Sequence, residues 1–155
     1  MSIGQHHSRP GPAPRILLVD DNAFGLSARK TILEELGYAV VAKPCPRQAL
    51  ECFSAGGFDL VITDYRMPGM DGAELIALLR KERADLPVVM ISGFADTLGL
   101  NEASTGASAV IQKSAHEVQM MLRAIERLLN RKASRKPVGN YRGATPPSRA
   151  IVGGA

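Results

Sequence analysis

Short apolar runs alternate with longer amphipathic segments along most of this 155-residue chain. The apolar runs are uninterrupted, as in parallel sheets that are covered by helices on both faces, and the segments between them repeat apolar residues at a helical period. The pattern predicts strands near residues 15–19, 38–43, 58–63, 87–91 and 107–112, and helices near residues 22–36, 46–55, 72–83, 95–103 and 115–131. Five alternating strand–helix units predict an α/β protein with a doubly wound parallel sheet.

The two ends of the chain have a different composition. Residues 1–14 are rich in Gly and Pro, and residues 132–155 combine Gly and Pro with little apolar material. Such segments cannot bury enough apolar surface to fold. We predict a disordered leader over 1–14, one folded domain over 15–131 and a disordered tail over 132–155. The tail is too short for a helix-turn-helix, so we expect no DNA-binding domain.

The net charge of +4 comes from the tail. Residues 15–130 hold 12 Lys/Arg and 15 Asp/Glu, and 12 − 15 gives −3, whereas residues 131–155 hold six Lys/Arg and no acid. A basic tail can make weak contacts with nucleic acid or an anionic membrane through counterion release. The alternative is a solubilising extension, and the sequence leaves both open.

The remaining composition points to the cytoplasm. No apolar run approaches the ~18–20 residues that span a bilayer, and the first residues lack the apolar region of a secretory signal. Cys45 and Cys52 form no metal-binding pair. We expect two reduced thiols, with Cys52 half-buried on a helix.

Polar side chains follow four of the predicted strands. Asp20 and Asp21 come directly after the first strand, Asp64 after the third, Ser92 after the fourth and Lys113 after the fifth. In an open parallel sheet, ligands bind outside the carboxyl ends of the strands. Three carboxylates at one rim repel one another unless a cation joins them. The set therefore suits a hard divalent metal and a phosphoryl group.

These residues also carry a family resemblance. With the stretch 64–72, Asp-Tyr-Arg-Met-Pro-Gly-Met-Asp-Gly, they resemble the receiver domain of two-component response regulators over residues 15–131. The resemblance implies a flavodoxin-like (βα)5 fold with strand order 2-1-3-4-5. By composition, Met67-Pro68-Gly69 is a turn and Asp71-Gly72 opens the third helix, so we interpret this stretch as scaffold for the loop beside Asp64.

The resemblance gives each residue at the rim a role. Asp64 would accept a phosphoryl group from a phosphohistidine on a sensor histidine kinase or a histidine phosphotransfer protein, as carboxylates do in aspartyl-phosphate enzymes. The cofactor would be Mg²⁺. Its ligands would be Asp21, Asp64, the backbone carbonyl of Arg66 and, through a water, Asp20. Lys113 and Ser92 would contact phosphoryl oxygens.

Each of these residues also has a plain structural alternative. Asp64 could cap the turn that follows it, and Asp20 or Asp21 could cap the helix that starts near residue 22. Lys113 could be a solvated lysine at a strand end, and Ser92 could start a turn.

The resemblance predicts a stand-alone, single-domain response regulator of the phosphorelay. It would signal by binding an unknown downstream protein, as a monomer or a phosphorylation-dependent dimer. It would not be an enzyme, although it would catalyse its own Mg²⁺-dependent phosphotransfer and autodephosphorylation. The alternative is a degenerate receiver that binds proteins independently of phosphorylation. A phosphatase of the haloacid dehalogenase type needs a second Asp where this chain has Arg66.

Four positions depart from the family pattern or vary within it. Val110 stands where the family often has a switching aromatic residue, and Ser114 stands where it usually has a proline after a cis peptide bond. A cis bond costs about 2.5–4 kcal/mol before other residues, so we expect a trans bond. Arg66 and Phe94 would flank the phosphoryl group, with Arg66 facing either phosphate or solvent.

The same resemblance predicts where a signal would leave the molecule. Output would pass to a face that includes helix 95–103 and exposed positions of helix 115–131, such as Met120 or Met121.

Overall fold

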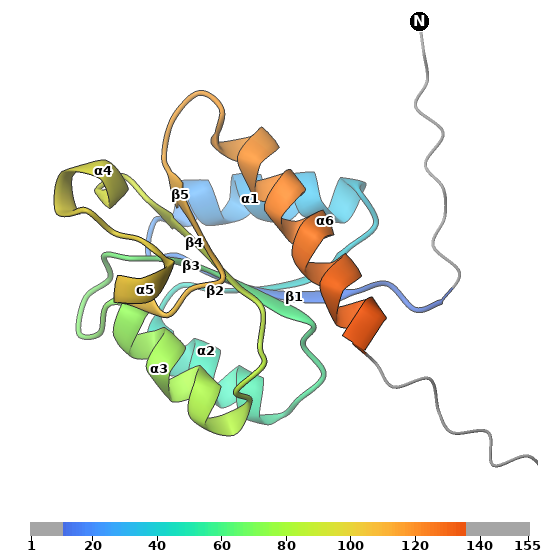
Figure 1. Ribbon diagram of the computed structural model, residues 1–155. Coiled ribbons are helices and arrows are strands. Elements are labelled where there is room, and N and C mark those ends of the chain that lie inside the picture. The colour runs from blue at the N-terminus through green and yellow to red at the C-terminus, as the bar shows by residue number, and fades with distance from the viewer. Residues whose placement is uncertain (1–10, 136–155) are drawn as a thin grey trace, which may run out of the picture.

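The computed structural model describes residues 11–135 and shows a single five-stranded parallel sheet between two layers of helices (Figure 1). The strand order is β2-β1-β3-β4-β5, which confirms the predicted topology. The strands are β1 (Arg15–Val19), β2 (Ala39–Lys43), β3 (Leu60–Asp64), β4 (Val88–Ser92) and β5 (Ala109–Gln112). The helices are α1 (Ala23–Glu35), α2 (Pro46–Ser54), α3 (Gly72–Glu82), α4 (Ala95–Leu98), α5 (Glu102–Thr105) and α6 (Glu117–Arg135).

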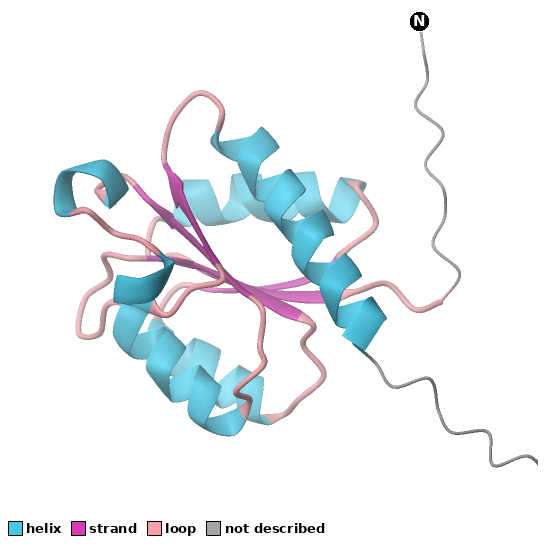
Figure 2. Ribbon diagram, viewed as in Figure 1, coloured by secondary structure: helices cyan, strands magenta, loops and turns pink. Residues whose placement is uncertain are grey.

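Helices cover both faces of the sheet, with α1 and α6 on one side and α2 and α3 on the other (Figure 2). Alternate residues of each central strand point to opposite faces. Ile16 and Leu18 of β1 therefore pack toward α1 and α6, and Leu17 and Val19 pack toward α2 and α3. The uninterrupted apolar strands predicted from the sequence are explained by this double coverage.

The carboxyl ends of the central strands are level with one another. Val19 of β1 pairs with Thr63 of β3, and Thr63 pairs with Met90 of β4. Ser92 at the end of β4 pairs with Gln112 at the end of β5. The polar residues that follow these strands are therefore delivered to one rim of the sheet.

The predicted helix over residues 95–103 is wrong as a single element. It is two short helices, α4 and α5, with a break between them. Gly99 ends α4 in the left-handed conformation, with φ +62°, and Asn101 caps α5 by accepting the Ser104 N–H. Glycine adopts that conformation without the cost other residues incur, which makes it a helix terminator.

The last helix runs four residues past its predicted end, to Arg135 rather than residue 131. Lys132 lies in the added turn and forms an ion pair with Asp59, with 3.1 Å between Nζ and Oδ1. The first residues of the predicted basic tail are therefore helical. Residues 1–10 of the predicted leader, and the tail beyond Arg135, lie outside the described residues.

Two smaller expectations can also be compared with the structure. Cys52 is half-buried on α2 and is a free thiol, as predicted. Within residues 11–135, no helix combines the length and the apolar character that a bilayer span requires.

Candidate functional site

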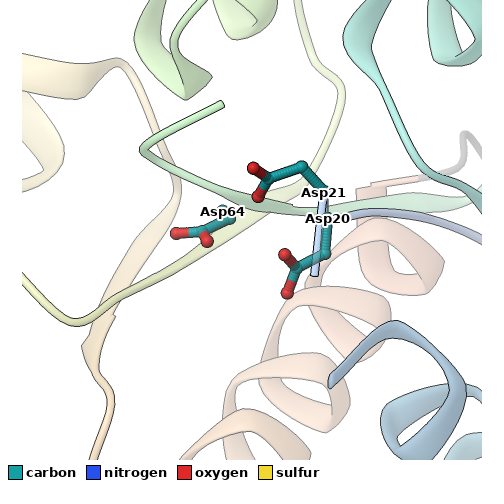
Figure 3. Close-up of side chains that lie close together, drawn as sticks. All are labelled: Asp20, Asp21 and Asp64. Carbon is teal, nitrogen blue, oxygen red and sulfur yellow. The ribbon is translucent and has the colours of Figure 1, made fainter. Parts of the chain in front are cut away.

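The rim at the carboxyl ends of the strands gathers the acidic residues predicted from the sequence. Asp20 and Asp21 follow β1, Asp64 ends β3, and one carboxylate oxygen from each lies within 4.8 Å of the others (Figure 3). Their exposure differs: Asp20 is buried, Asp64 is partly buried and Asp21 is exposed. The cluster is therefore open to solvent on the Asp21 side.

Asp64 is held by a neighbouring cation and a backbone amide. The Lys113 ammonium donates to Oδ2 at 3.1 Å, and the Tyr65 N–H donates to Oδ1 at 2.7 Å. Burial nevertheless raises the pKa of the Asp64 carboxyl above its ordinary value, because it outweighs the opposing effect of Lys113, and the charge of Asp20 raises it further. A cation at the cluster would relieve this unfavourable placement of negative charge.

The start of α3 packs directly against the backbone of Asp64. The Gly72 N–H donates to the Tyr65 carbonyl at 2.7 Å. A Cβ at Gly72 would clash with the Asp64 carbonyl oxygen and lie 3.0 Å from the Met90 Cε. Asp71 caps the helix in a reciprocal pair of hydrogen bonds with Glu74. These contacts support the expectation that Asp71-Gly72 is scaffold for the loop beside Asp64.

Ser92 and Lys113 are joined through the backbones of their strand ends. The Lys113 N–H donates to the Ser92 carbonyl at 2.9 Å, and the Gln112 side chain donates to the Gly93 carbonyl. The Ser92 hydroxyl is buried and accepts the Phe94 N–H at 3.1 Å. This turn is the structural alternative considered for Ser92, and it keeps the oxygen at the rim with a proton still to donate.

Asp20 is paired with a residue that sequence reasoning missed. Its Oδ2 accepts from the Arg29 guanidinium at 2.7 Å, and its Oδ1 accepts from the Asn22 N–H at 2.9 Å. Neither Asp20 nor Asp21 caps α1, so that alternative is wrong: Asn22 is the cap and accepts the Gly25 N–H. Arg29 also donates to Glu117 at the start of α6. The one signal in the sequence was a glycine, Gly25, inside an amphipathic helix.

Arg66 and Phe94 stack on each other beside the rim. The Arg66 guanidinium carbon lies 4.0 Å from the centre of the Phe94 ring, and both residues are exposed. The Arg66 side chain therefore faces solvent and an aromatic ring, in line with the second of its two predicted placements. An open cleft lies alongside, lined by Asp21, Tyr65, Arg66, Met67, Pro68, Asp71 and Leu98.

The structure also shows the conformation of Val110 and Ser114, the other two positions that depart from the family pattern. Val110 is partly buried and packs against the core on the α2–α3 side of the sheet. The Lys113–Ser114 peptide bond is trans, as expected.

The donor set fits a small hard cation. The three side chains that converge offer only carboxylate oxygens, the ligands that Mg²⁺ prefers. Asp64 and Asp20 already form ion pairs, with Lys113 and Arg29 respectively. The exposed carboxylate of Asp21 borders the open cleft, which leaves space for the water that Mg²⁺ usually retains.

Comparison with known proteins agrees with this geometry. The sequence model of the response regulator receiver domain matches residues 16–126. A receiver structure from Clostridium thermocellum superposes with a TM-score of 0.70 at 27% identity, covering 78% of this chain and 98% of that one. A structure of the response regulator TrrA from Thermotoga maritima, in complex with Mg²⁺ and BeF, superposes with a TM-score of 0.66 at 29% identity over 74% and 98% of the two chains.

A curated relative is much longer than this chain. The sensor protein GacS from Pseudomonas syringae pv. syringae is 38% identical over 88 residues, which is 54% of this chain but only 10% of GacS. The match to the family model, by contrast, covers most of the chain and nearly all of the sheet and its helices. With five parallel strands in the order 2-1-3-4-5 and an acidic cluster at their carboxyl ends, this chain belongs to the response regulator receiver domain family of two-component phosphorelay signalling.

Proposed function

We propose that this chain accepts a phosphoryl group on Asp64 from the phosphohistidine of a sensor histidine kinase or a histidine phosphotransfer protein. The observation that supports this best is the meeting of three carboxylates within 4.8 Å, with the Lys113 ammonium 3.1 Å from Asp64. An ammonium beside a carboxylate nucleophile is placed to neutralise charge that gathers on a transferring phosphoryl group.

The proposed transfer is a displacement at phosphorus. An Asp64 carboxylate oxygen forms the new P–O bond, the P–N bond to the donor histidine breaks, and its electron pair stays on the imidazole nitrogen. Lys113 then turns from Asp64 to a phosphoryl oxygen, and the Ser92 hydroxyl donates to another. Autodephosphorylation removes the phosphoryl group by hydrolysis: water attacks phosphorus, the bond to Asp64 breaks, the carboxylate is regenerated, and inorganic phosphate leaves.

We propose Mg²⁺ as the cofactor of this site. Asp21 and Asp64 would bind the ion directly, the Arg66 carbonyl would complete the protein ligands, and Asp20 would hold a coordinating water. Bound Mg²⁺ would offset the repulsion among the carboxylates and the charge on the phosphoryl group. The placement of Asp20 supports its indirect role, because Asp20 is buried and bonded to the Arg29 guanidinium, whereas Asp21 is exposed and Asp64 is only partly buried.

Output is proposed to be protein–protein binding at the α4–β5–α6 face. Met120 is 45% exposed whereas Met121 is buried, which selects Met120 as the adaptable contact predicted for this face. We retain the expectation of a cytoplasmic location for this exchange.

Incubation of the protein with acetyl phosphate, with Mg²⁺ or with EDTA, tests the proposal by intact mass. We expect the mass of one phosphoryl group to be added with Mg²⁺, and little or none with EDTA. Absence of labelling under both conditions, together with binding of a partner by the unmodified protein, would favour the alternative of a phosphorylation-independent binding module.

A further inference from the structure

Arg29 joins the acidic cluster to the first turn of α6. One guanidinium nitrogen donates to Asp20 Oδ2 at 2.7 Å and another donates to Glu117 Oε1 at 2.9 Å, across 88 residues of sequence. Arg29 and Asp20 are buried, and the Glu117 side chain is only 20% exposed. Charge-assisted hydrogen bonds of this kind are the strong ones, and burial protects them from screening by salt.

The local structure makes room for this contact. A Cβ at Gly25 would lie 3.3 Å from the bonded guanidinium nitrogen of Arg29 and 3.5 Å from Asp20 Oδ2. Glycine lowers the stability of a helix interior relative to alanine. Helix α1 nevertheless has a glycine, Gly25, at the position next to the Arg29 guanidinium. Burial of an arginine is itself unfavourable unless its partners compensate, and the Arg29 Nε has no partner among residues 11–135.

Arg29 places a positive charge beside one of the three carboxylates of the rim. Lys113 contacts Asp64 and Arg29 contacts Asp20, whereas Asp21 makes no ion pair within the described part of the chain. A positive charge in direct contact with one of three carboxylates repels a cation that binds among them. Glu117 faces the same guanidinium from the other side and offsets part of that charge.

We propose that Arg29 is a positioning residue that sets the cation affinity of the acidic cluster and couples its occupation to the start of α6 through Glu117; the proposal rests on the metal site of the proposed function. A bound cation attracts the negative charge of Asp20 and so weakens the hydrogen bond between Asp20 and Arg29. Glu117 is then the stronger partner of Arg29. Because coupling between two sites is reciprocal, the charge of Glu117 in turn affects how tightly the cation binds. This route does not pass through Val110.

The test is a Mg²⁺ titration of the full chain, followed by isothermal calorimetry and by amide NMR. Arg29→Gln removes the repelling charge, and we expect Mg²⁺ to bind several-fold tighter, on the order of threefold to tenfold. Glu117→Gln leaves the full charge of Arg29 facing the cluster, and we expect several-fold weaker binding. Arg29→Lys keeps the charge and should restore an affinity close to that of the wild type.

NMR provides the readout for coupling. In the wild type, Mg²⁺ should shift the amide signals of Glu117 and Val118 as well as those of the rim. In Arg29→Gln, the rim signals should still shift and those of Glu117 and Val118 should not. Arg47→Gln is the matched control, because Arg47 forms its ion pair with Glu51, in which both side chains are exposed, and the substitution should change neither measurement.

Four results would overturn the inference. If Arg29→Gln and Glu117→Gln both weaken Mg²⁺ binding, Arg29 only holds the fold together, and if neither changes it, the charge of Arg29 does not reach the site. Should Arg29→Gln fail to fold, Glu117→Gln decides alone, and unchanged affinity in that variant refutes the coupling. A wild-type protein that binds no Mg²⁺ would instead remove the metal site, and with it both proposals.

Discussion

The three acidic residues of the rim have different surroundings, and these assign them different tasks. Asp20 is buried and bonded to Arg29, Asp64 is partly buried and bonded to Lys113, and Asp21 is exposed. An exposed carboxylate is free to bind a cation at little cost. A buried carboxylate that is already bonded contributes mainly by holding its neighbours in place.

This division predicts different effects for two similar substitutions. Asp21→Asn should weaken Mg²⁺ binding strongly and leave the free energy of unfolding nearly unchanged. Asp20→Asn should weaken Mg²⁺ binding less but lower the free energy of unfolding by about 1–3 kcal/mol, because the buried guanidinium of Arg29 loses a charged acceptor. Calorimetric titration and urea denaturation of both variants check this, and unaltered Mg²⁺ binding in Asp21→Asn would contradict the ligand role.

The raised pKa of Asp64 predicts a pH-dependent effect on stability. The folded protein binds this proton more tightly than the unfolded chain does, so the contribution of Asp64 is most favourable at acidic pH and is lost as the pH rises through the raised pKa. At neutral pH without metal, Asp64→Asn should therefore increase the free energy of unfolding. The gain should shrink toward acidic pH.

Urea denaturation in EDTA across a pH series measures this effect. Lys113 loses its charged partner in the same variant, so the net gain should be modest in size. A loss of stability at neutral pH would show that the ion pair with Lys113 outweighs the burial of Asp64.

At the scale of elements, the position of the site depends on where helices begin. The first residue of α3, Gly72, packs on the carbonyl of Asp64 and donates to that of Tyr65. The geometry of the loop after Asp64 is therefore fixed by the first residue of α3, which contributes no side chain to the rim.

Gly72→Ala should both destabilise the fold and impair the site. A methyl group there meets backbone atoms that cannot move aside, and overpacking of this kind typically costs about 1–3 kcal/mol. Phosphorylation by acetyl phosphate should slow in parallel. Gly93→Ala is the matched control for stability, since its Cβ would approach only the Lys113 Cδ, at 3.9 Å. Equal stability of the two variants would contradict this account.

The elements also show which features could be predicted from the sequence. The strands were recognisable because burial on both faces leaves uninterrupted apolar runs, and the rim residues were recognisable because they follow those runs directly. The break after α4 has signals in the sequence, because Gly99 suits the end of a helix and Asn101 suits the start of the next, but the apolar periodicity of residues 95–103 predicts one continuous helix. Helix α6 continues to Arg135, past its predicted end at residue 131, and no helix-breaking residue occurs between that predicted end and Pro137.

Arg29 illustrates what sequence reasoning could not reach. An arginine on an amphipathic helix is ordinarily a solvated residue, and its partners here come from residue 20 and residue 117. Only the assembled fold brings the start of α6 against α1. Pairings between distant elements depend on tertiary packing, which hydrophobic periodicity does not specify.

At the scale of the whole molecule, the structural change caused by phosphorylation should extend from the rim toward the sheet edge that carries β5. A phosphoryl group adds about −1.5 to −2 charges at neutral pH, which Ser92 and Lys113 would contact. Because Val110 replaces the switching aromatic residue, we expect small changes carried by the backbone. Amide NMR of the phosphorylated protein should show perturbations concentrated at residues 92–104 and 110–120. Perturbations confined to the rim that carries Asp20, Asp21 and Asp64 would show that the output route lies elsewhere.

The central claim, that Asp64 is the phosphoacceptor, is tested most directly by intact mass spectrometry after incubation with acetyl phosphate and Mg²⁺. Wild type and two variants, Asp64→Asn and Asp59→Asn, are compared, because Asp59 lies at the opposite end of β3 from the rim. The account predicts the mass of one phosphoryl group on wild type and on Asp59→Asn, and none on Asp64→Asn. Equal labelling of Asp64→Asn and wild type would contradict it.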